Sequence, residues 1–331
     1  MTAFVKLYKA GRYPIVLLIA ALLPLLTKNN YFLHIANQAL LFAIMTLSLN
    51  LLTGCTGLFS VGHIAFYGIG AYTSAILTTR FAVPVLLGIV AGGVVAGLFG
   101  LVLGVPTLRL RGLYLTISTL AFGEIMYQLF VNWDAVTQGA RGIKGIPSPA
   151  VFGVALDTYA KFYYLALAFT IVTILLCHNL LRCRTGRAML AIRENDIAAE
   201  GMGINLVKYK IIAFVISSFF AGIAGALYAH EVHYISPESF VSAESTAVLA
   251  MMVVGGIGSI PGAVIGGVAL TIIPEYLRAF GDIRLVIYGV AIVVIIIFAP
   301  KGIGGALLWL ERLLTGDAGR GMPGRKGGKG Q

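Results

Sequence analysis

Glu124 is the side chain that departs most from its surroundings, because it lies within the long apolar stretch 112–132. A carboxyl group at the centre of a bilayer costs about 2.5–3.5 kcal/mol unless it is paired or neutral. Such a residue either lines a polar pathway or gate, or makes an interhelical hydrogen bond. His63 lies in the apolar stretch 57–79. It either lines the pathway or is a buried histidine whose nitrogens are hydrogen-bonded within the core.

Other polar side chains also fall within apolar stretches, and together they form the candidate set for a pathway across the membrane. The six candidates are Asn37, Gln38, Asn50, Ser60, His63 and Glu124. No set of His, Cys, Asp and Glu has the spacing of metal ligands, and no nucleophile with an attendant base stands out. The three cysteines form no CxxC pair. The pattern therefore argues against a membrane enzyme, and we expect neither metal nor cofactor in this chain.

A second cluster of charged residues lies in the polar segment 182–210, which is flanked on both sides by long apolar runs. Its length suits two short helices on the membrane face. We expect one helix over 186–194 with Thr185 as its N-cap, and a second through Glu200 with Asn195 or Asp196 as its N-cap. Gly201 or Gly203 can end the second helix. Such rigid surface helices suit the docking of a partner, whereas a solvated helix that only sets topology is the alternative.

The elements that position these residues follow from composition. Hydrophobic residues make up 59% of the chain, charged residues only 11%, and the mean hydropathy is +0.93. Soluble domains carry about 25% charged residues, so the chain is predicted to be an all-α polytopic membrane protein. The net charge of +11 does not indicate nucleic-acid binding, because the basic residues lie mostly in short loops and tails.

Apolar runs of about 20 residues predict about ten (8–10) transmembrane helices. The predicted spans are 13–28, 31–53, 57–79, 82–105, 112–132, 161–181, 209–230, 243–258, 261–278 and 284–300. The spans 13–28, 57–79 and those within 243–278 are short or interrupted by glycine, and we expect them to be the ones that are broken or re-entrant. The strongest candidate for a break is 255–261, where glycines precede a proline.

The distribution of Lys and Arg predicts the orientation. With both termini in the cytoplasm, most of the 24 Lys and Arg fall on the inner side, as the positive-inside rule requires. The expected organisation is a cytoplasmic N-terminus (1–12), a transmembrane permease domain (13–305) and a largely disordered, basic cytoplasmic tail (306–331). Within the membrane domain, 182–210 is the cytoplasmic loop and 133–160 the outer loop.

No G-x-x-x-x-G-K-[ST] motif is present, so the chain does not bind ATP through a P-loop of its own. Ion coupling would usually show several intramembrane ionisable groups, and Glu124 stands nearly alone. The remaining route is an ATPase in trans on the loop 182–210. An ion-coupled secondary transporter and a passive channel for a small neutral solute are the alternatives.

Five stretches carry a family resemblance: 50–72, 113–124, 185–200, 221–228 and 255–262. Through them, nearly everything from about 31 to 305 resembles the permease subunits of branched-chain amino acid ABC importers, in particular the LivM type. The resemblance implies a non-enzymatic subunit of the bacterial cytoplasmic (inner) membrane. It also implies four kinds of partner: a LivH-like second permease, two ATPases that bind ATP and Mg, a periplasmic substrate-binding protein, and the lipid membrane.

The same resemblance makes 185–203 the counterpart of the ABC importer coupling segment. The implied coupling residues are Arg187, Arg193, Glu194, Asn195, Asp196, Glu200 and Gly203. Similar permeases carry urea, short amides or other amino acids, so the substrate stays open between these and branched-chain amino acids.

Overall fold

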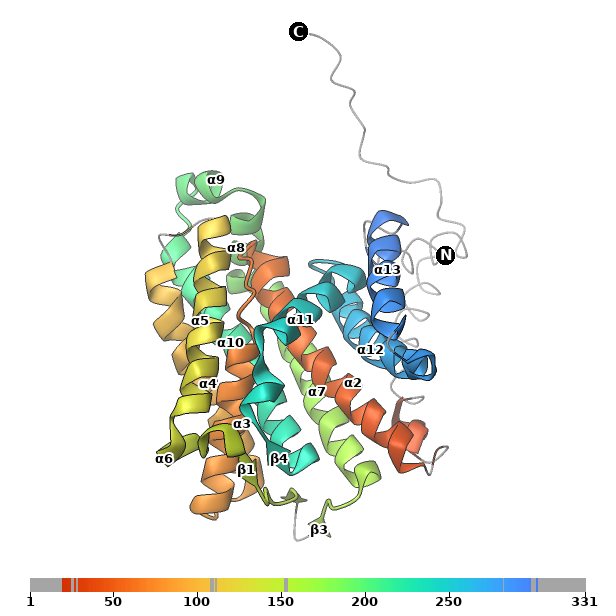
Figure 1. Cartoon of the computed structure of the whole chain (residues 1–331). Coiled ribbons are helices and arrows are strands. Elements are labelled where there is room, and N and C mark those ends of the chain that lie inside the picture. The colour runs from red at the N-terminus through yellow and green to blue at the C-terminus, as the bar shows by residue number, and fades with distance from the viewer. Residues whose placement is uncertain are drawn as a thin grey trace, which may run out of the picture.

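Helices make up most of the chain in the computed structural model, which describes residues 20–24, 27, 29–107, 110, 112–151, 154–281, 283–298 and 302 (Figure 1). The apolar helices are α2 (Asn30–Leu49) with its π-helical extension η1 (Asn50–Gly54), α3 (Ile64–Arg80), α4 (Val85–Thr107), α5 (Leu113–Asn132), α7 (Tyr159–Arg182), α10 (Leu206–Val232), α11 (Ser242–Gly255), α12 (Ile260–Tyr276) and α13 (Ile283–Phe298).

Shorter elements connect them. They are α6 (Asp134–Thr137), η2 (Gly139–Arg141), β1 (Ile143–Lys144), β2 (Ala150–Val151), β3 (Val154–Ala155), α8 (Arg184–Glu194), α9 (Asp196–Gly201), β4 (Tyr234–Ile235), η3 (Pro237–Phe240) and η4 (Leu277–Phe280). In Figure 1, α8 and α9 lie at one end of the bundle, and α6, β1, β3 and β4 lie at the opposite end.

Six helical segments of the described chain are long and apolar enough to cross a membrane: Asn30–Gly54, Val85–Thr107, Leu113–Asn132, Tyr159–Arg182, Leu206–Val232 and Pro237–Gly255. A shorter apolar helix follows at Ile260–Tyr276. The predicted spans from 82–105 onward match helices within a few residues. The predicted span 13–28 lies largely outside the described residues, as do the segments 1–12 and 306–331.

The predicted span 57–79 is only partly right, because residues 57–63 form neither helix nor strand and α3 begins at Ile64. Tertiary hydrogen bonds stabilise this non-helical path. The Val61 N–H donates to Thr119 Oγ1 of α5 at 3.1 Å, and the Ile64 N–H donates to Ser245 Oγ of α11 at 2.9 Å. Irregular backbone at membrane depth requires such internal partners. The broken helix expected at this place is therefore present.

Glycines let the backbones of α3, α4 and α10 touch. A Cβ added at Gly225 of α10 would overlap the Tyr67 carbonyl oxygen of α3, and one at Gly70 of α3 would overlap Gly222 of α10. One added at Gly92 of α4 would lie 2.7 Å from the Gly70 carbonyl oxygen. In lipid, where the hydrophobic effect does not drive helices together, close approach gains dispersion contacts. These three helices are accordingly among the most extensively paired in the bundle.

The predicted break at 255–261 is confirmed. Helix α11 ends at Gly255, Gly256 and Gly258 have φ values of 115° and 82°, and α12 starts at Ile260. Ser259 caps α12 by accepting from the Gly262 N–H at 3.2 Å. The two helices pack as a hairpin against α2, and the conformations at Gly256 and Gly258 are ones that only glycine adopts readily.

The loop between α5 and α7 departs slightly from the all-α prediction. β1 pairs antiparallel with β4, which places Ile143 opposite Ile235, and β2 pairs with β3. Beside the first pair, His230 Nδ1–H donates to the Pro147 carbonyl at 2.8 Å and His233 Nδ1–H donates to the Ile146 carbonyl at 2.9 Å. The loop between α5 and α7 is thus fastened to the end of α10.

Candidate coupling loop and translocation face

The segment 182–210 folds into the two short helices expected, but the first begins earlier than predicted. Helix α8 starts at Arg184 with Cys183, not Thr185, in the extended N-cap position. The thiol of Cys183 is exposed, and its hydrogen bond from the Gly186 backbone N–H lowers its pKa below the ordinary value. Negative charge is favoured at a helix N-terminus, so a thiolate is stabilised at this position.

Helix α9 is capped at both ends. Asn195 Oδ1 accepts from the Ala198 N–H at 2.9 Å, which confirms Asn195 as the N-cap. At the C-terminal end, Gly203 has a φ of 81°, and its N–H donates to the Glu200 carbonyl while the Ile204 N–H donates to the Ala199 carbonyl. This pair of bonds is the Schellman motif, so Gly203 ends the helix because of its backbone conformation.

One face of the α8–α9 unit packs inward and the other is open. The buried residues of α8 are Gly186, Ala188, Met189 and Ile192. The predicted coupling residues Arg187, Glu194 and Glu200 are exposed on the other face. Two large apolar side chains stand beside them, Ile197 and Met202, which are 73% and 84% exposed. Apolar side chains with a charged surround are typical of a protein–protein contact.

Two other predicted coupling residues, Asp196 and Arg193, bond to groups of the membrane helices. Lys210 Nζ, which is nearly buried at the start of α10, lies 2.7 Å from Asp196 Oδ2. Arg193 Nη1 donates to the Gly54 carbonyl at 2.6 Å. Arg193 is exposed as well, so the predicted set divides by its bonds: Asp196 and Arg193 connect α9 and α8 to the membrane helices, and Arg187, Glu194 and Glu200 do not.

The six predicted pathway residues do not converge on one site. Asn37 and Gln38 lie near the end of the bundle opposite α8, where Asn37 Nδ2 donates to the Tyr159 carbonyl at 3.2 Å. Gln38 Nε2 donates to Glu231 Oε2 at 2.7 Å, and His34 Nδ1–H donates to Glu231 Oε1 at 2.6 Å. The Glu231 side chain is completely buried, so α2 and α10 are joined by a buried carboxylate.

Asn50, Ser60 and His63 are also buried, but farther along the chain. Asn50 Oδ1 accepts from the Gly258 N–H at 2.7 Å. His63 Nε2 lies 2.8 Å from Ser48 Oγ, so one of its nitrogens is satisfied in the core. The other ring nitrogen of His63 and the hydroxyl of Ser60 have no hydrogen-bond partner among the described residues.

Glu124 lies on the surface of this subunit, which corrects the expectation of a buried carboxyl. Helix α5 packs through a single narrow stripe of residues, Leu115, Thr119, Gly123, Met126 and Phe130. Glu124 lies just outside that stripe and is exposed, and its carboxylate accepts a hydrogen bond from Ser242 Oγ at the start of α11. Glu244, two residues farther on, is half-buried.

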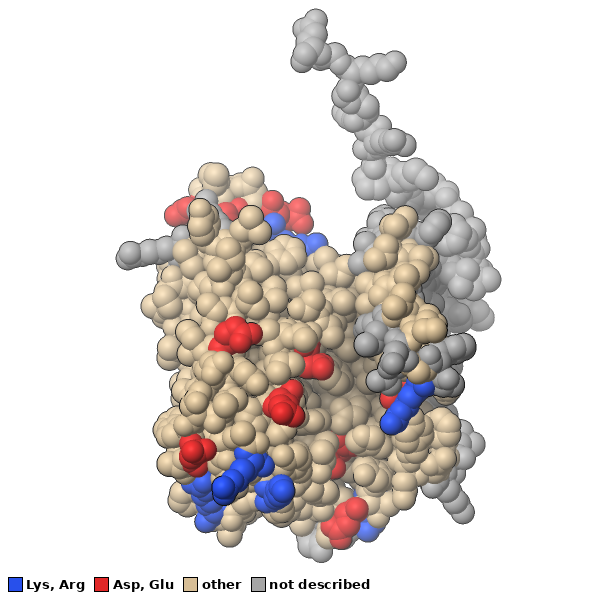
Figure 2. Space-filling model, viewed as in Figure 1, with Lys and Arg blue, Asp and Glu red and all other residues tan. Residues whose placement is uncertain are grey.

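The face that α5 and α11 form carries two acidic groups within apolar helices, the exposed Glu124 and the half-buried Glu244. Figure 2 shows acidic side chains in the central part of a face that otherwise carries mostly uncharged residues. We call Glu124, Ser242 and Glu244 the acidic face. Charged groups inside a membrane face protein or water rather than lipid.

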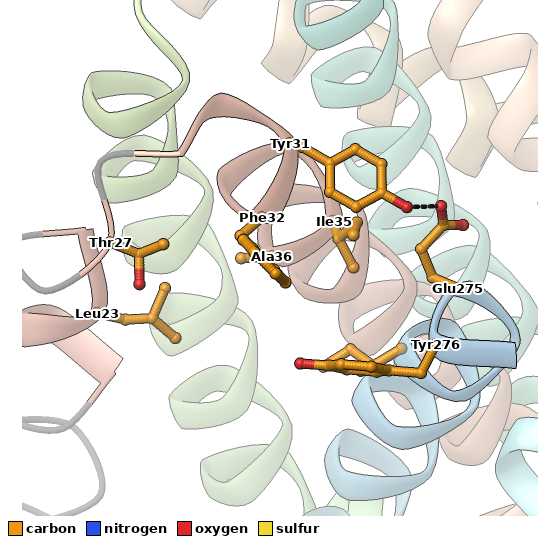
Figure 3. Close-up of a pocket in the computed structure, with 9 residues that line it drawn as sticks. Leu23, Thr27, Tyr31, Phe32, Ile35, Ala36, Glu275 and Tyr276 are labelled. Atoms are coloured by element: carbon orange, nitrogen blue, oxygen red, sulfur yellow. Dashed lines mark hydrogen bonds between the residues drawn. The ribbon is translucent and has the colours of Figure 1, made fainter. Parts of the chain in front are cut away.

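A separate cavity lies elsewhere in the described part of the chain. It has a volume of about 350 Å³ and lies between the start of α2, the end of α12 and residues Leu23 and Thr27 (Figure 3). In it the Tyr31 hydroxyl donates to the Glu275 carboxylate. Its lining contains none of the six predicted pathway residues, so it is separate from the acidic face.

Sequence reasoning missed Glu231 and Glu244. Glu231 directly follows the apolar run predicted as the span 209–230 and so fell outside the predicted spans, whereas α10 continues to Val232. A helix that continues past the apolar run would have placed Glu231 one turn after Leu227 and on the same buried face.

The comparisons with known proteins agree with this architecture. A family model described as the permease component of branched-chain amino acid transport systems matches residues 31–299. The high-affinity branched-chain amino acid transport system permease proteins LivM of Salmonella typhimurium and of Escherichia coli K12 are each 36% identical over 292 residues, which cover 81% of this chain and 69% of theirs. LivH of Escherichia coli K12 is 26% identical over 290 residues, covering 80% of this chain and 91% of its own.

No solved structure gives a significant match. The family model covers most of the chain, including every transmembrane-length helix of the described residues. The matched range also contains both α8–α9 and the acidic face. The chain therefore belongs to the family of permease components of branched-chain amino acid transport systems.

Proposed function

We propose that the chain is a permease subunit of an ABC importer for branched-chain amino acids and forms one half of an alternating-access pathway. The structural observation that carries the proposal is the α8–α9 unit, two capped helices with an exposed face that joins charged and large apolar side chains. The LivM relatives, which are named as high-affinity branched-chain amino acid permeases, support the substrate class.

The exposed face of α8–α9 is the docking site for one of two ATPase subunits, which bind ATP and Mg. Arg187, Glu194 and Glu200 are the charged contacts, and Ile197 and Met202 are the apolar ones. Their exposure supports this role. A capped helix transmits a displacement along its axis, whereas a flexible loop absorbs it.

The acidic face is where a LivH-like second permease completes the pathway. Glu124 and Glu244 attract the ammonium group of a zwitterionic amino acid, and Ser242 hydrogen-bonds to Glu124 and thereby orients it. The exposure of Glu124 at membrane depth supports a pathway role over a purely structural one. A periplasmic binding protein would deliver the substrate at the opposite end from α8–α9.

The orientation that fits this assembly places α8–α9 and both termini in the cytoplasm of a bacterial inner membrane. The excess of Lys and Arg on that side supports it. About ten spans are consistent with the nine apolar helices α2, α3, α4, α5, α7, α10, α11, α12 and α13 plus one over 13–28.

The test is affinity purification of the subunit from its native membrane, followed by reconstitution of the purified complex in liposomes. We expect a second permease and a Walker-motif ATPase to co-purify, and uptake of leucine, isoleucine or valine to require internal ATP. Glu200→Arg with Arg187→Glu is expected to release the ATPase, and Lys208→Gln serves as the control.

Recovery of the subunit alone, with uptake that collapses with the ion gradient and ignores ATP, would replace the proposal with a secondary transporter. ATP-driven uptake of urea or a short amide in preference to the branched-chain amino acids would keep the importer and change its substrate. Flux without accumulation would indicate a passive channel.

A further inference from the structure

Arg193 lies at a junction of three segments that are far apart in the chain. Its Nη1 donates to the carbonyl of Gly54, the last residue of the π-helical end of α2. A Cβ added at Gly258, in the turn between α11 and α12, would overlap the same nitrogen. The Arg193 stem also lies 3.8 Å from a Cβ built at Gly57. The guanidinium therefore occupies space that the missing Cβ of Gly258 leaves open.

Asn50 closes the junction from the other side. Its Oδ1 accepts from the Gly258 N–H at 2.7 Å, and its Nδ2 lies 3.4 Å from the Ser259 carbonyl. Asn50 begins the π-helical turn that ends at Gly54. Single π-turns inside α-helices are frequent at functional sites. One asparagine thus attaches the end of α2 to the turn of the α11–α12 hairpin.

A cavity of about 150 Å³ lies beside this junction, and its lining includes Thr56–Phe59, Arg193, Asp196 and Lys210. Here the last turn of α8 and the non-helical segment after α2 are separated by space, and the Arg193 side chain bridges between them. Among the described residues, Arg193 makes the hydrogen bond that joins α8 to the end of α2.

We propose that Arg193 and Asn50 are positioning residues that form a mechanical linkage, through which the movement of α8 reaches both the non-helical segment 57–63 and the α11–α12 hairpin. This deepens the proposed function and rests on it, because α8 moves only if an ATPase drives it. The hairpin leads directly to the acidic face, since α11 begins at Ser242 beside Glu124. Arg193 transmits the movement, whereas Arg187 and Glu200 receive it.

The linkage predicts that Arg193 variants separate ATP hydrolysis from transport. In the complete complex in liposomes, Arg193→Gln is expected to keep the ATPase bound and hydrolysing while uptake per ATP falls at least about tenfold, the change that follows from losing roughly 1.4 kcal/mol of a charge-assisted hydrogen bond. Arg193→Lys, which keeps one donor, is expected to recover part of the uptake. Arg184→Gln, on the exposed side of the same helix, is the matched control.

Asn50→Ala is expected to have the same phenotype, and the double variant with Arg193→Gln is expected to be no worse than either single variant. Additive losses would overturn a shared linkage. Wild-type uptake per ATP in Arg193→Gln would overturn it too. Loss of the ATPase from Arg193→Gln would make Arg193 a docking residue instead and would also overturn the linkage.

A second measurement does not depend on activity. Spin labels at Leu190→Cys on α8 and Ile257→Cys in the α11–α12 turn, both partly exposed, are placed in a Cys183→Ser background. With the linkage intact, their separation is expected to be the same in nucleotide-free and vanadate-trapped complexes, and with Arg193→Gln it is expected to change on trapping. A separation that changes in the intact complex, or stays constant in Arg193→Gln, overturns the linkage. Absence of ATP-driven uptake in the wild type would instead overturn the proposed function.

Discussion

Replacement of the buried carboxylate Glu231 is expected to destabilise the subunit more than any change to an exposed acid. Glu231 accepts from His34 and from Gln38, and its side chain has no exposed surface. Glu231→Ala removes both acceptors and leaves two donors facing an apolar gap. Hydrogen bonds to charged groups contribute about 1.5–3 kcal/mol each. The His34 side chain is 40% exposed, so water can replace part of its bond.

The expected loss for Glu231→Ala is therefore about 3–5 kcal/mol, the range found when one partner of a buried pair is removed. Glu231→Gln keeps the shape and one acceptor, and we expect roughly 1 kcal/mol for it. At about 2 °C per kcal/mol for a chain of this size, the alanine variant melts roughly 6–10 °C below the wild type. Thermal unfolding of the purified subunit in detergent, followed by size-exclusion chromatography, measures the difference.

Glu238→Ala is the matched control, because this exposed carboxylate in η3 is expected to leave the melting temperature within about 1 °C. A double-mutant cycle with His34→Ala isolates the pairwise energy. If Glu231→Ala has the same melting temperature as Glu238→Ala, or if the cycle gives no coupling energy, the reasoning that a buried paired carboxylate joins α2 to α10 is wrong.

Three further predictions concern other parts of the subunit. Gly225→Ala pushes a methyl group into the backbone of α3 and is expected to lower stability by about 1–3 kcal/mol or more, whereas Gly201→Ala, in open space, is expected to be neutral in the same melting assay. Glu124→Gln keeps the side-chain shape but removes the charge, and we expect leucine uptake to fall about tenfold or more with the ATPase still bound; normal uptake would assign Glu124 a structural role. Because its pKa is lowered, Cys183 is expected to react with iodoacetamide faster at pH 7–8 than an ordinary exposed thiol, and the reaction rate is expected to rise with pH through a pKa below the usual one. A bound ATPase should slow the reaction, and Cys183→Ser should abolish it. A rate profile centred on an ordinary thiol pKa would refute the prediction.

Most membrane helices could be predicted from the sequence because hydropathy depends on composition alone. The beginning of α3 could not, since 57–63 is kept out of a helix by hydrogen bonds to Thr119 and Ser245, which lie far along the chain. The turn at 255–261 could be predicted, because glycine and proline act on their own backbone. Local sequence signals therefore predict the break at 255–261, and they only suggest the one at 57–63.

For the candidate site, the sequence identifies the residue types but not the direction in which each side chain points. Arg193 belonged to the predicted coupling set, yet its guanidinium contacts Gly54, and only the packing of α8 determines this. Glu124 was expected to be buried and lies on the surface, because α5 contributes one narrow stripe to the core. Both cases depend on which side of a helix its neighbours cover, and hydropathy alone does not encode that.

The non-helical segment 57–63 also constrains how the chain is synthesised. Two of its backbone partners, Thr119 and Ser245, come 58 residues after Val61 and 181 residues after Ile64. Each unpaired backbone group would cost several kcal/mol in lipid, so this stretch cannot enter the bilayer alone when it leaves the ribosome. We therefore expect helices α2 and α3 to remain beside the insertion machinery, in contact with water, until α5 and then α11 have been made. A nascent chain that stops before α5 would keep this stretch exposed, in a form that membrane proteases can recognise.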